Sequence, residues 1–348
     1  MAPTPAAGSP ADADRLRRLR EAKLRGLVRG AFGDTVAAAP VLAFPEGAAI
    51  VADATAWVLA DGAAGRALGR ALAFAAGRGA ADLHLIVDEA DPTGESTRRP
   101  QRGVLARRAG LLAGPTTVWT VEGTTLAPVA PAPRPPRGDE LPPGSEPFVA
   151  MLREAGVDVV VEHGVLLGEI LGLEVARVVD GALQVGVGRF DREAAAVVWS
   201  DRPTEAALAA VVHHIRRQRH PGATPHPVNR LCRERWLRTQ VLADPSVAGL
   251  AGATLARVPP PEPRDNLRDP APAPALGTDA GGRRVLVVCS VGADLELAPV
   301  TADLADRDRP DRVVLVTPAR DQLAPQRALA ARLGVPHELV AVEGDWPA

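Results

Sequence analysis

The chain has 348 residues, is 46% hydrophobic and carries a formal net charge of -2. This length predicts two or three domains with sizeable cores. The near-neutral charge excludes a general attraction to nucleic acid or anionic membranes, so any such binding requires a local patch. Lys23 is the single lysine in a composition typical of GC-rich coding, such as bacterial genes, which argues against Schiff-base, P-loop and catalytic-lysine mechanisms.

The cysteine content and the hydropathy pattern indicate a cytoplasmic location. Cys232 and Cys289 have no partner at metal-binding spacing, which argues against zinc ribbons and a disulfide framework and fits a reducing compartment. No run of 18 apolar residues is present, so we expect no membrane-spanning helix and no membrane partner. The amino terminus lacks the apolar core of a secretory signal.

The first part of the chain predicts an α/β module. Residues 1–12 read as a disordered tail, and residues 13–31 carry leucines at helical spacing, typical of a surface helix packed on the first domain. Strand-like and helix-like segments then alternate as β-α-β-α-β between residues 48 and 123. This order predicts a parallel sheet with covering helices in an N-terminal module, residues 13–126.

Two proline-rich segments, residues 127–147 and 258–282, predict linkers. Between them, residues 148–257 predict a β-meander followed by two helices, and residues 283–348 repeat the β-α-β-α-β order. The predicted fold is therefore α/β, with two Rossmann-like wings flanking a central β-rich and helical module. The similar strands VWTVEG and LVAVEG suggest related wings, but the match is too short to establish a duplication.

An acidic hairpin in the central module is a candidate metal site. Glu162, Glu169 and Glu174 lie on neighbouring predicted strands, and hard divalent cations prefer several carboxylate oxygens. Glu162 and Glu174 share parity, whereas Glu169 requires a bulge near Gly168 or Gly172 to join them. Mg²⁺ or Mn²⁺ is the expected cofactor on this interpretation. The alternative is an amphipathic hairpin whose acids face solvent.

A helix carrying Glu154, a carboxylate on the next strands and the run Glu174-Val175-Ala176 weakly resemble the PD-(D/E)XK nuclease core over residues 147–200. The resemblance implies that two acidic groups bind the metal and that a lysine two residues after the second one assists the attacking water. Ala176 occupies that lysine position. This departure argues against catalysis but is compatible with a nuclease-like fold used for binding.

The run GVGRFDRE at residues 186–193 is a candidate active-site rim. Arg189 and Arg192 would hold an oxyanion, and Asp191 would contribute to metal binding, while the two glycines permit close backbone approach. With Glu162 and Glu174, these arginines form the predicted catalytic set. The alternative is a strand end that leads into a helix with local ion pairs.

An arginine-rich segment, residues 213–238, is the candidate anion or nucleic-acid surface, because guanidinium groups bind phosphate in a bidentate manner. Its second helix is expected to begin at Val228 and to turn Leu231, Trp236 and Leu237 inward. The seven arginines are Arg216, Arg217, Arg219, Arg230, Arg233, Arg235 and Arg238. The alternative is an ordinary charged surface.

Two glycine-containing turns are candidate phosphate or nucleotide loops, because ligands of open α/β sheets gather where strands lead into helices. The first contains Gly62 and Gly65, and the second contains Ser290, Gly292 and Asp294. Neither has the spacing of a dinucleotide fingerprint, so ordinary βα loops are the alternative.

The leading hypothesis is a protein that binds DNA or RNA, with metal-dependent phosphodiester hydrolysis left open. The alternatives are a nucleotide or phosphometabolite binder or enzyme using the wing crevices, and a non-catalytic assembly protein. The chain is only 3% aromatic and has no tyrosine, which favours contacts to a duplex backbone over base stacking.

Overall fold

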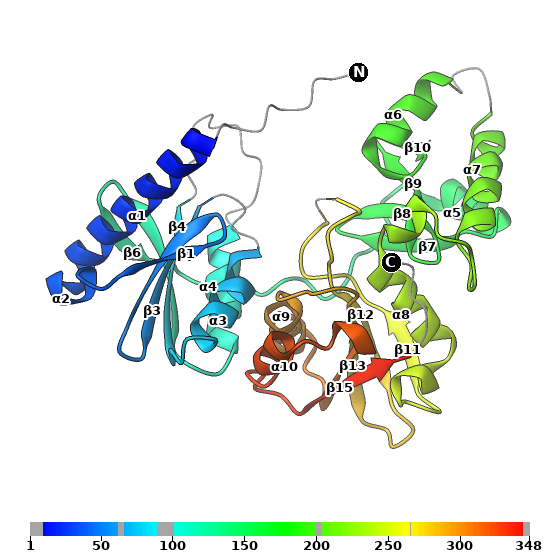
Figure 1. Ribbon diagram of the computed structural model, residues 1–348. Helices are drawn as coiled ribbons and strands as arrows, with labels where there is room; N and C mark the ends of the chain where they lie inside the picture. Colours follow the sequence, from blue (N-terminus) through cyan, green and yellow to red (C-terminus); the bar gives the residue numbers. More distant parts are fainter. Residues whose placement is uncertain (1–9, 62–65, 89–100, 199–202, 265, 344–348) are drawn as a thin grey trace. The chain divides into compact units, whose positions relative to one another are not determined.

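The computed structural model describes residues 10–61, 66–88, 101–198, 203–264 and 266–343. The chain divides into two compact units, of which the first comprises residues 1–133 and 328–334 and the second comprises the remainder. The described residues form an α/β structure with sheets of six, four and five strands (Figure 1). No described helix is long and apolar enough to cross a membrane.

The first unit contains the six-stranded sheet, in which the strands are ordered as in the sequence. Its third, fourth and fifth strands are parallel to one another, as the β-α-β-α-β pattern predicts, and the other pairings are antiparallel. The strands are β1 (Val41–Phe44), β2 (Gly47–Ala52), β3 (Thr55–Asp61), β4 (Asp82–Asp88), β5 (Thr116–Glu122) and β6 (Thr125–Pro128). Helices α3 (Ala67–Ala76) and α4 (Gln101–Leu111) make the parallel crossovers.

Helix α1 (Pro10–Phe32) packs on this sheet through its second half, next to the short α2 (Asp34–Ala37). Leu24 and Val28 are fully buried against β2 and β3, whereas Leu16 and Leu19 remain exposed. In Figure 1, α3 and α4 lie on the other side of the sheet from α1. The helix begins at Pro10, so residues 10–12, predicted as part of the disordered tail, are helical.

The central sheet is the predicted antiparallel meander, with neighbouring strands in chain order. Its strands are β7 (Asp158–Glu162), β8 (Val165–Ile170), β9 (Leu173–Val179) and β10 (Ala182–Val185), preceded by α5 (Glu146–Glu154) and followed by α6 (Gly188–Val198) and α7 (Thr204–Gln218). Each hairpin turns through a residue-glycine pair with positive φ at both positions. Such type I′ turns match the twist of paired strands and fix their register. Apolar residues of α5, the sheet and α7 form one core.

The second unit also contains the five-stranded sheet, in which β13, β14 and β15 are parallel. The elements of this wing are α8 (Arg233–Ala243), β11 (Thr254–Arg257), β12 (Ala273–Thr278), β13 (Arg284–Cys289), α9 (Leu297–Asp308), β14 (Arg312–Pro318), α10 (Ala324–Ala330) and β15 (His337–Val342), of which the last residues of α10 are counted with the first unit. Strand β12 lies inside the predicted linker 258–282. Its small buried residues Ala273 and Ala275 stand among prolines, which disguised the strand pattern.

The two wings share one topology that extends beyond the predicted repeat. In each, a helix precedes an antiparallel pair, and three parallel strands with crossover helices follow: α1, β1 to β5 in one, and α8, β11 to β15 in the other. Helix α8 packs on β12 and β13 as α1 packs on β2 and β3. By position in this topology, α8 therefore belongs to the C-terminal wing, although the sequence pattern assigned it to the central module.

The turn between β8 and β9 provides a test of packing between the central sheet and α8. Gly172, with φ of 75°, lies so close to α8 that an added Cβ would stand 2.5 Å from the Arg235 carbonyl carbon. Gly164 has nearly the same φ, 73°, but no described atom within 4 Å of its Cβ position. We expect Gly164→Ala to cost about 1–2 kcal/mol from backbone strain alone, and Gly172→Ala to cost a further ~1–3 kcal/mol from overpacking.

The measurement is urea unfolding of the two variants and the parent chain. Equal losses of stability would contradict the close approach of α8 to this turn, because the two substitutions share the same backbone strain.

Candidate anion-binding site

The acidic hairpin directs two of its carboxylates onto one buried guanidinium. Arg235 Nη2 donates to Glu162 Oε2 at 2.6 Å, and Arg235 Nη1 donates to Glu169. In the unshifted β7–β8 register, Glu162 pairs with Val165 and Asp158 with Glu169, so Glu162 and Glu169 share a face without the expected bulge. The register shift between Gly168 and Glu169 lies in the β8–β9 pairing, where Glu169 comes to stand opposite Glu174. Arg238 Nη2 lies 3.6 Å from the second Glu169 oxygen. The side chains of both glutamates and both arginines are buried. The alternative in which the acids of the hairpin face solvent is therefore wrong for Glu162 and Glu169.

These charges stabilise one another at neutral pH. Burial by itself would raise the pKa of Glu169, but the positive charges of Arg235, Arg238 and Arg257 outweigh it and hold that pKa below its ordinary value. Burial would likewise lower the pKa of Arg235, and Glu169 and Glu162 reverse that effect and raise it. Arg238 lies farther from its carboxylate partner Glu169, and burial lowers the pKa of its guanidinium. Glu162, Glu169 and Arg235 therefore form an internal ion-pair cluster.

Glu174 belongs to a different ion-pair cluster. Arg177 holds it with two hydrogen bonds, of 3.0 and 2.9 Å, and Arg192 Nη1 donates to it at 2.7 Å. Burial lowers the pKa of Arg192, and Glu174 partly offsets this. Ala176, at the position of the family's lysine, is fully buried in the central core.

The run 186–193 leads from the end of β10 into α6. It therefore matches the alternative interpretation from the sequence, a strand end that leads into a helix with local ion pairs. Asp191 accepts a hydrogen bond from the Val187 backbone N–H at 2.7 Å, and Arg189 pairs with Glu193 on the exposed helix surface. Gly186 is required because a Cβ would stand 2.9 Å from the Arg192 backbone nitrogen. Gly186 therefore allows the chain at the end of β10 to approach the backbone of α6 closely.

The four predicted metal ligands thus do not face one common site but are divided among three sets of partners. Glu162 and Glu169 bind Arg235, Glu174 binds Arg177 and Arg192, and Asp191 caps a loop amide. Within the described ranges, no three His, Cys, Asp or Glu side chains are grouped to hold a metal ion. A resident Mg²⁺ or Mn²⁺ would have to displace charge-assisted hydrogen bonds at each carboxylate.

Arg219 is an internal scaffold residue, contrary to its predicted role at an anion surface. Its guanidinium donates to four backbone carbonyls, those of Leu171, Val228, Leu231 and Cys232, at 2.9–3.2 Å. It also lies over the Trp236 ring, 4.6 Å from the centroid. Burial lowers its pKa to about 10. These contacts order the connection between α7 and α8.

Arg235 and Arg238 face inward, contrary to their predicted place on an anion surface, and α8 begins later than the sequence pattern predicts. Cys232 has φ of 47°, and this left-handed residue separates α8 from the 3-10 helix η2 (Pro227–Arg230). The expected inward positions Trp236 and Leu237 are buried, but Arg235 and Arg238 are buried with them. Arg230 lies exposed outside the helix, and Arg233 lies half-buried near Gly292.

Arg216 and Arg217 are the arginines of the segment that α7 exposes to solvent. The buried face of this helix carries Leu208, Val211 and Ile215, which join the central core. The solvent side carries His213, His214, Arg216 and Arg217. These residues follow one another at three- and four-residue spacings, so they form one stripe on the helix surface, which we call the α7 basic stripe.

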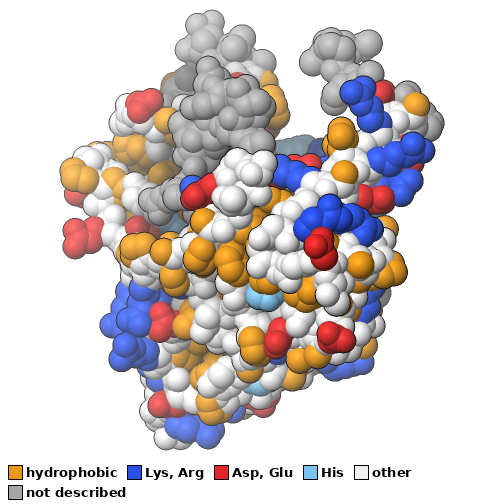
Figure 2. Space-filling view, turned by 90° about the vertical axis from the view of Figure 1, so that its left-hand side faces the viewer, with side chains coloured by type: hydrophobic (Ala, Val, Ile, Leu, Met, Phe, Trp, Pro, Cys, Tyr) orange, Lys and Arg blue, Asp and Glu red, His pale blue; other side chains and the backbone are white. Residues whose placement is uncertain are grey.

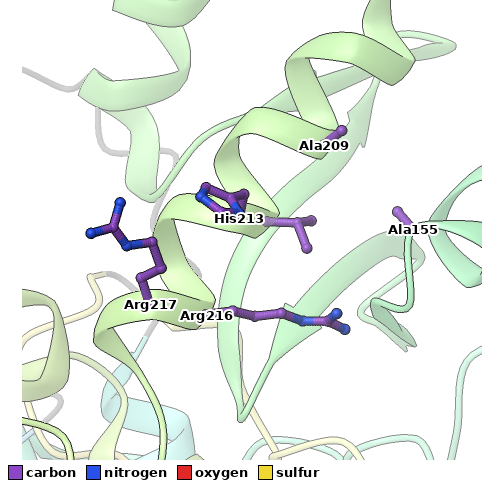
Figure 3. Close-up of a pocket in the computed structure, with 6 residues that line it drawn as sticks. Ala155, Ala209, His213, Arg216 and Arg217 are labelled. Carbon is purple, nitrogen blue, oxygen red and sulfur yellow. The ribbon is translucent and has the colours of Figure 1, made fainter.

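A shallow pocket of about 380 Å³ opens beside this stripe. It is lined by Ala155, Ala209, Val212, His213, Arg216 and Arg217. In Figure 3, Arg216 extends toward the segment carrying Ala155, Arg217 extends to the opposite side, and His213 stands between them. The sequence hypothesis included both arginines but did not name His213 as a site residue. The histidine pair within a helical run would have been the available signal.

The second predicted phosphate loop satisfies its own polar groups. Ser290 Oγ donates to Asp294 at 3.0 Å, the Asp294 carboxylate accepts from the Glu296 amide, and the Gly292 amide donates to Asp321 at 2.6 Å. The loop thus presents two carboxylates where a phosphate would require free N–H groups, so its geometry opposes the predicted role. Gly62 and Gly65 of the first loop lie outside the described residues.

The internal ion-pair cluster is tested by Arg235→Met. Removing one partner of a buried pair leaves two carboxylates without their cation, and we expect a loss of about 3–5 kcal/mol in the free energy of unfolding. Arg189→Ala is the control, since its pair with Glu193 is exposed and should contribute nothing measurable. Urea denaturation measures both, and a double variant with Glu169→Gln should cost less than the sum of the single changes. Similar small losses for Arg235→Met and Arg189→Ala would contradict the cluster.

Comparison with known proteins identifies no relative: no protein family, curated protein or solved structure matches this chain. The function must therefore be inferred from the side chains and their contacts, and the α7 basic stripe is the predicted anion surface that the fold leaves accessible.

Proposed function

We propose that this protein binds nucleic acid through the α7 basic stripe and that its acidic hairpin is structural. The observation that carries the proposal is the exposure of Arg216, Arg217, His213 and His214 on one side of α7. Arg217 makes no ion pair with any described residue, so its guanidinium is available to a phosphate group. Arginine is well suited to this role because its planar fork matches two phosphate oxygens.

The charge distribution supports a local contact and not a broad electrostatic one. On the face drawn in Figure 2, lysine and arginine side chains form small groups among acidic and hydrophobic ones. This mixture agrees with the net charge of -2. A short basic stripe on one helix would neutralise only a few phosphates, so we expect modest affinity with a shallow dependence on salt.

Metal-dependent cleavage is not included in the proposal. Glu162, Glu169 and Glu174 are each held by at least one guanidinium, and the family's lysine position carries the buried Ala176. Each carboxylate already has a charged partner, so none is available as a metal ligand without breaking an ion pair. Nucleotide binding in the C-terminal loop is not included either, because Asp294 and Asp321 oppose a phosphate there.

The test is the binding of a fluorescent DNA duplex and of single-stranded DNA and RNA, followed by anisotropy over a salt series. Arg217→Ala should weaken duplex binding and make the slope of log K against log salt shallower by about 0.9, because one phosphate contact is lost. Arg268→Ala is the matched control, since it removes the same charge from an exposed arginine of the same unit outside the stripe.

Two results would contradict the proposal. One is the absence of binding to every nucleic acid at low salt. The other is an unchanged salt slope in Arg217→Ala, which would locate any binding elsewhere on the protein.

A further inference from the structure

The pocket beside the α7 basic stripe combines an apolar wall with cationic groups. Ala155, Ala209 and Val212 supply the apolar part, while His213, Arg216 and Arg217 supply N–H donors. None of the six lining residues is acidic. Its volume of about 380 Å³ lies at the small end of the range of ligand pockets, about 300–1,000 Å³. These features suit one small anion attached to an uncharged body.

Arg216 is held in place at the edge of this pocket. Its Nη2 donates to the Gly156 carbonyl at 2.7 Å. Gly156 ends α5 with φ of 70°, and its own amide and that of Val157 close the helix with hydrogen bonds to Arg153 and Leu152. A Cβ on Gly156 would stand 2.7 Å from Arg216 Nη2. The guanidinium can therefore reach this carbonyl because residue 156 is glycine.

This anchoring leaves most of the guanidinium available. A guanidinium has five N–H donors, and one of them is used by Gly156. No acidic side chain among the described residues pairs with Arg216. A guanidinium that is already positioned loses less conformational freedom when an anion binds, which favours affinity at this edge of the pocket.

We propose that the pocket binds the terminal phosphomonoester of a nucleic-acid strand, an inference that rests on the proposed nucleic-acid binding. A monoester carries up to two negative charges, whereas an internal phosphodiester carries one. Arg216, anchored at the pocket edge, and the neighbouring His213 supply the donors for this dianion, while Arg217 extends to the opposite side and adds positive charge nearby. The sugar of the terminal nucleotide would lie against Ala155, Ala209 and Val212.

The first experiment compares two short DNA duplexes of identical sequence, one with 5′-phosphates and one with 5′-hydroxyls. Anisotropy with the full chain should show about tenfold tighter binding of the phosphorylated duplex, equivalent to about 1.4 kcal/mol. Thymidine 5′-monophosphate should compete for binding, whereas thymidine should not. Inorganic phosphate should compete more weakly than the monophosphate, because it cannot use the apolar wall.

The second experiment uses variants of the anchor. Arg216→Ala and Gly156→Ala should each remove the preference for the phosphorylated duplex, while Arg268→Ala should retain it. Arg216→Ala should retain binding of the hydroxyl duplex at a lower affinity through Arg217. Thermal denaturation verifies that Gly156→Ala remains folded, and Arg216→Ala tests the site independently of backbone strain at Gly156.

The outcomes separate the two proposals. Equal binding of the two duplexes by the parent chain would overturn the terminal-phosphate site and leave nucleic-acid binding intact. If neither duplex binds, the proposed function fails. Thermal denaturation with thymidine 5′-monophosphate, compared with thymidine, then tests whether the pocket binds a phosphomonoester. A higher melting temperature with the monophosphate, lost in Arg216→Ala, would support the phosphate site, and no difference would overturn it.

Discussion

The burial of Arg235 between Glu162 and Glu169 is the interaction on which the second unit depends. Each of these charges would be costly inside the protein alone, because burial penalises the ionised form. Arg235 donates to both carboxylates, and its own backbone stands against Gly172 in the turn of the same sheet. The central sheet and α8 are therefore joined by charge and by close packing at one residue.

This contact links modules with different architectures. The central module is an antiparallel meander, whereas α8 belongs by topology to the C-terminal wing, whose helix and strand order repeats that of the N-terminal wing. Leu171, in the same turn as Gly172, packs with both the central core and the core beneath α8. The connection between α7 and α8 is in turn ordered by the carbonyl contacts of Arg219.

The seven arginines of one segment differ in burial. Arg219, Arg235 and Arg238 are internal and lie against carbonyls or carboxylates, whereas Arg216 and Arg217 remain on the surface of α7; Arg230 is exposed and Arg233 is half-buried outside that helix. A guanidinium serves either purpose because its planar fork binds a carbonyl, a carboxylate or a phosphate equally well in geometric terms. The abundance of arginine in this chain therefore indicates little about function until the accessible side chains are known.

The sequence by itself determined the α/β class, the parallel segments of both wings and the central meander, because these follow from local periodicity and turn residues. The expected need for a bulge near Gly168 or Gly172 to bring Glu169 to Glu162 was wrong, because the β7–β8 register already puts the two residues on one face. Only the tertiary structure decided which charges face inward: Arg235 and Arg238 are buried beside Trp236 and Leu237 because the carboxylates Glu162 and Glu169 of the central sheet lie against them. The pocket beside α7 was inaccessible to sequence patterns because Ala155 and α7 meet only in the folded chain, and strand β12 was missed because its small residues stand among prolines.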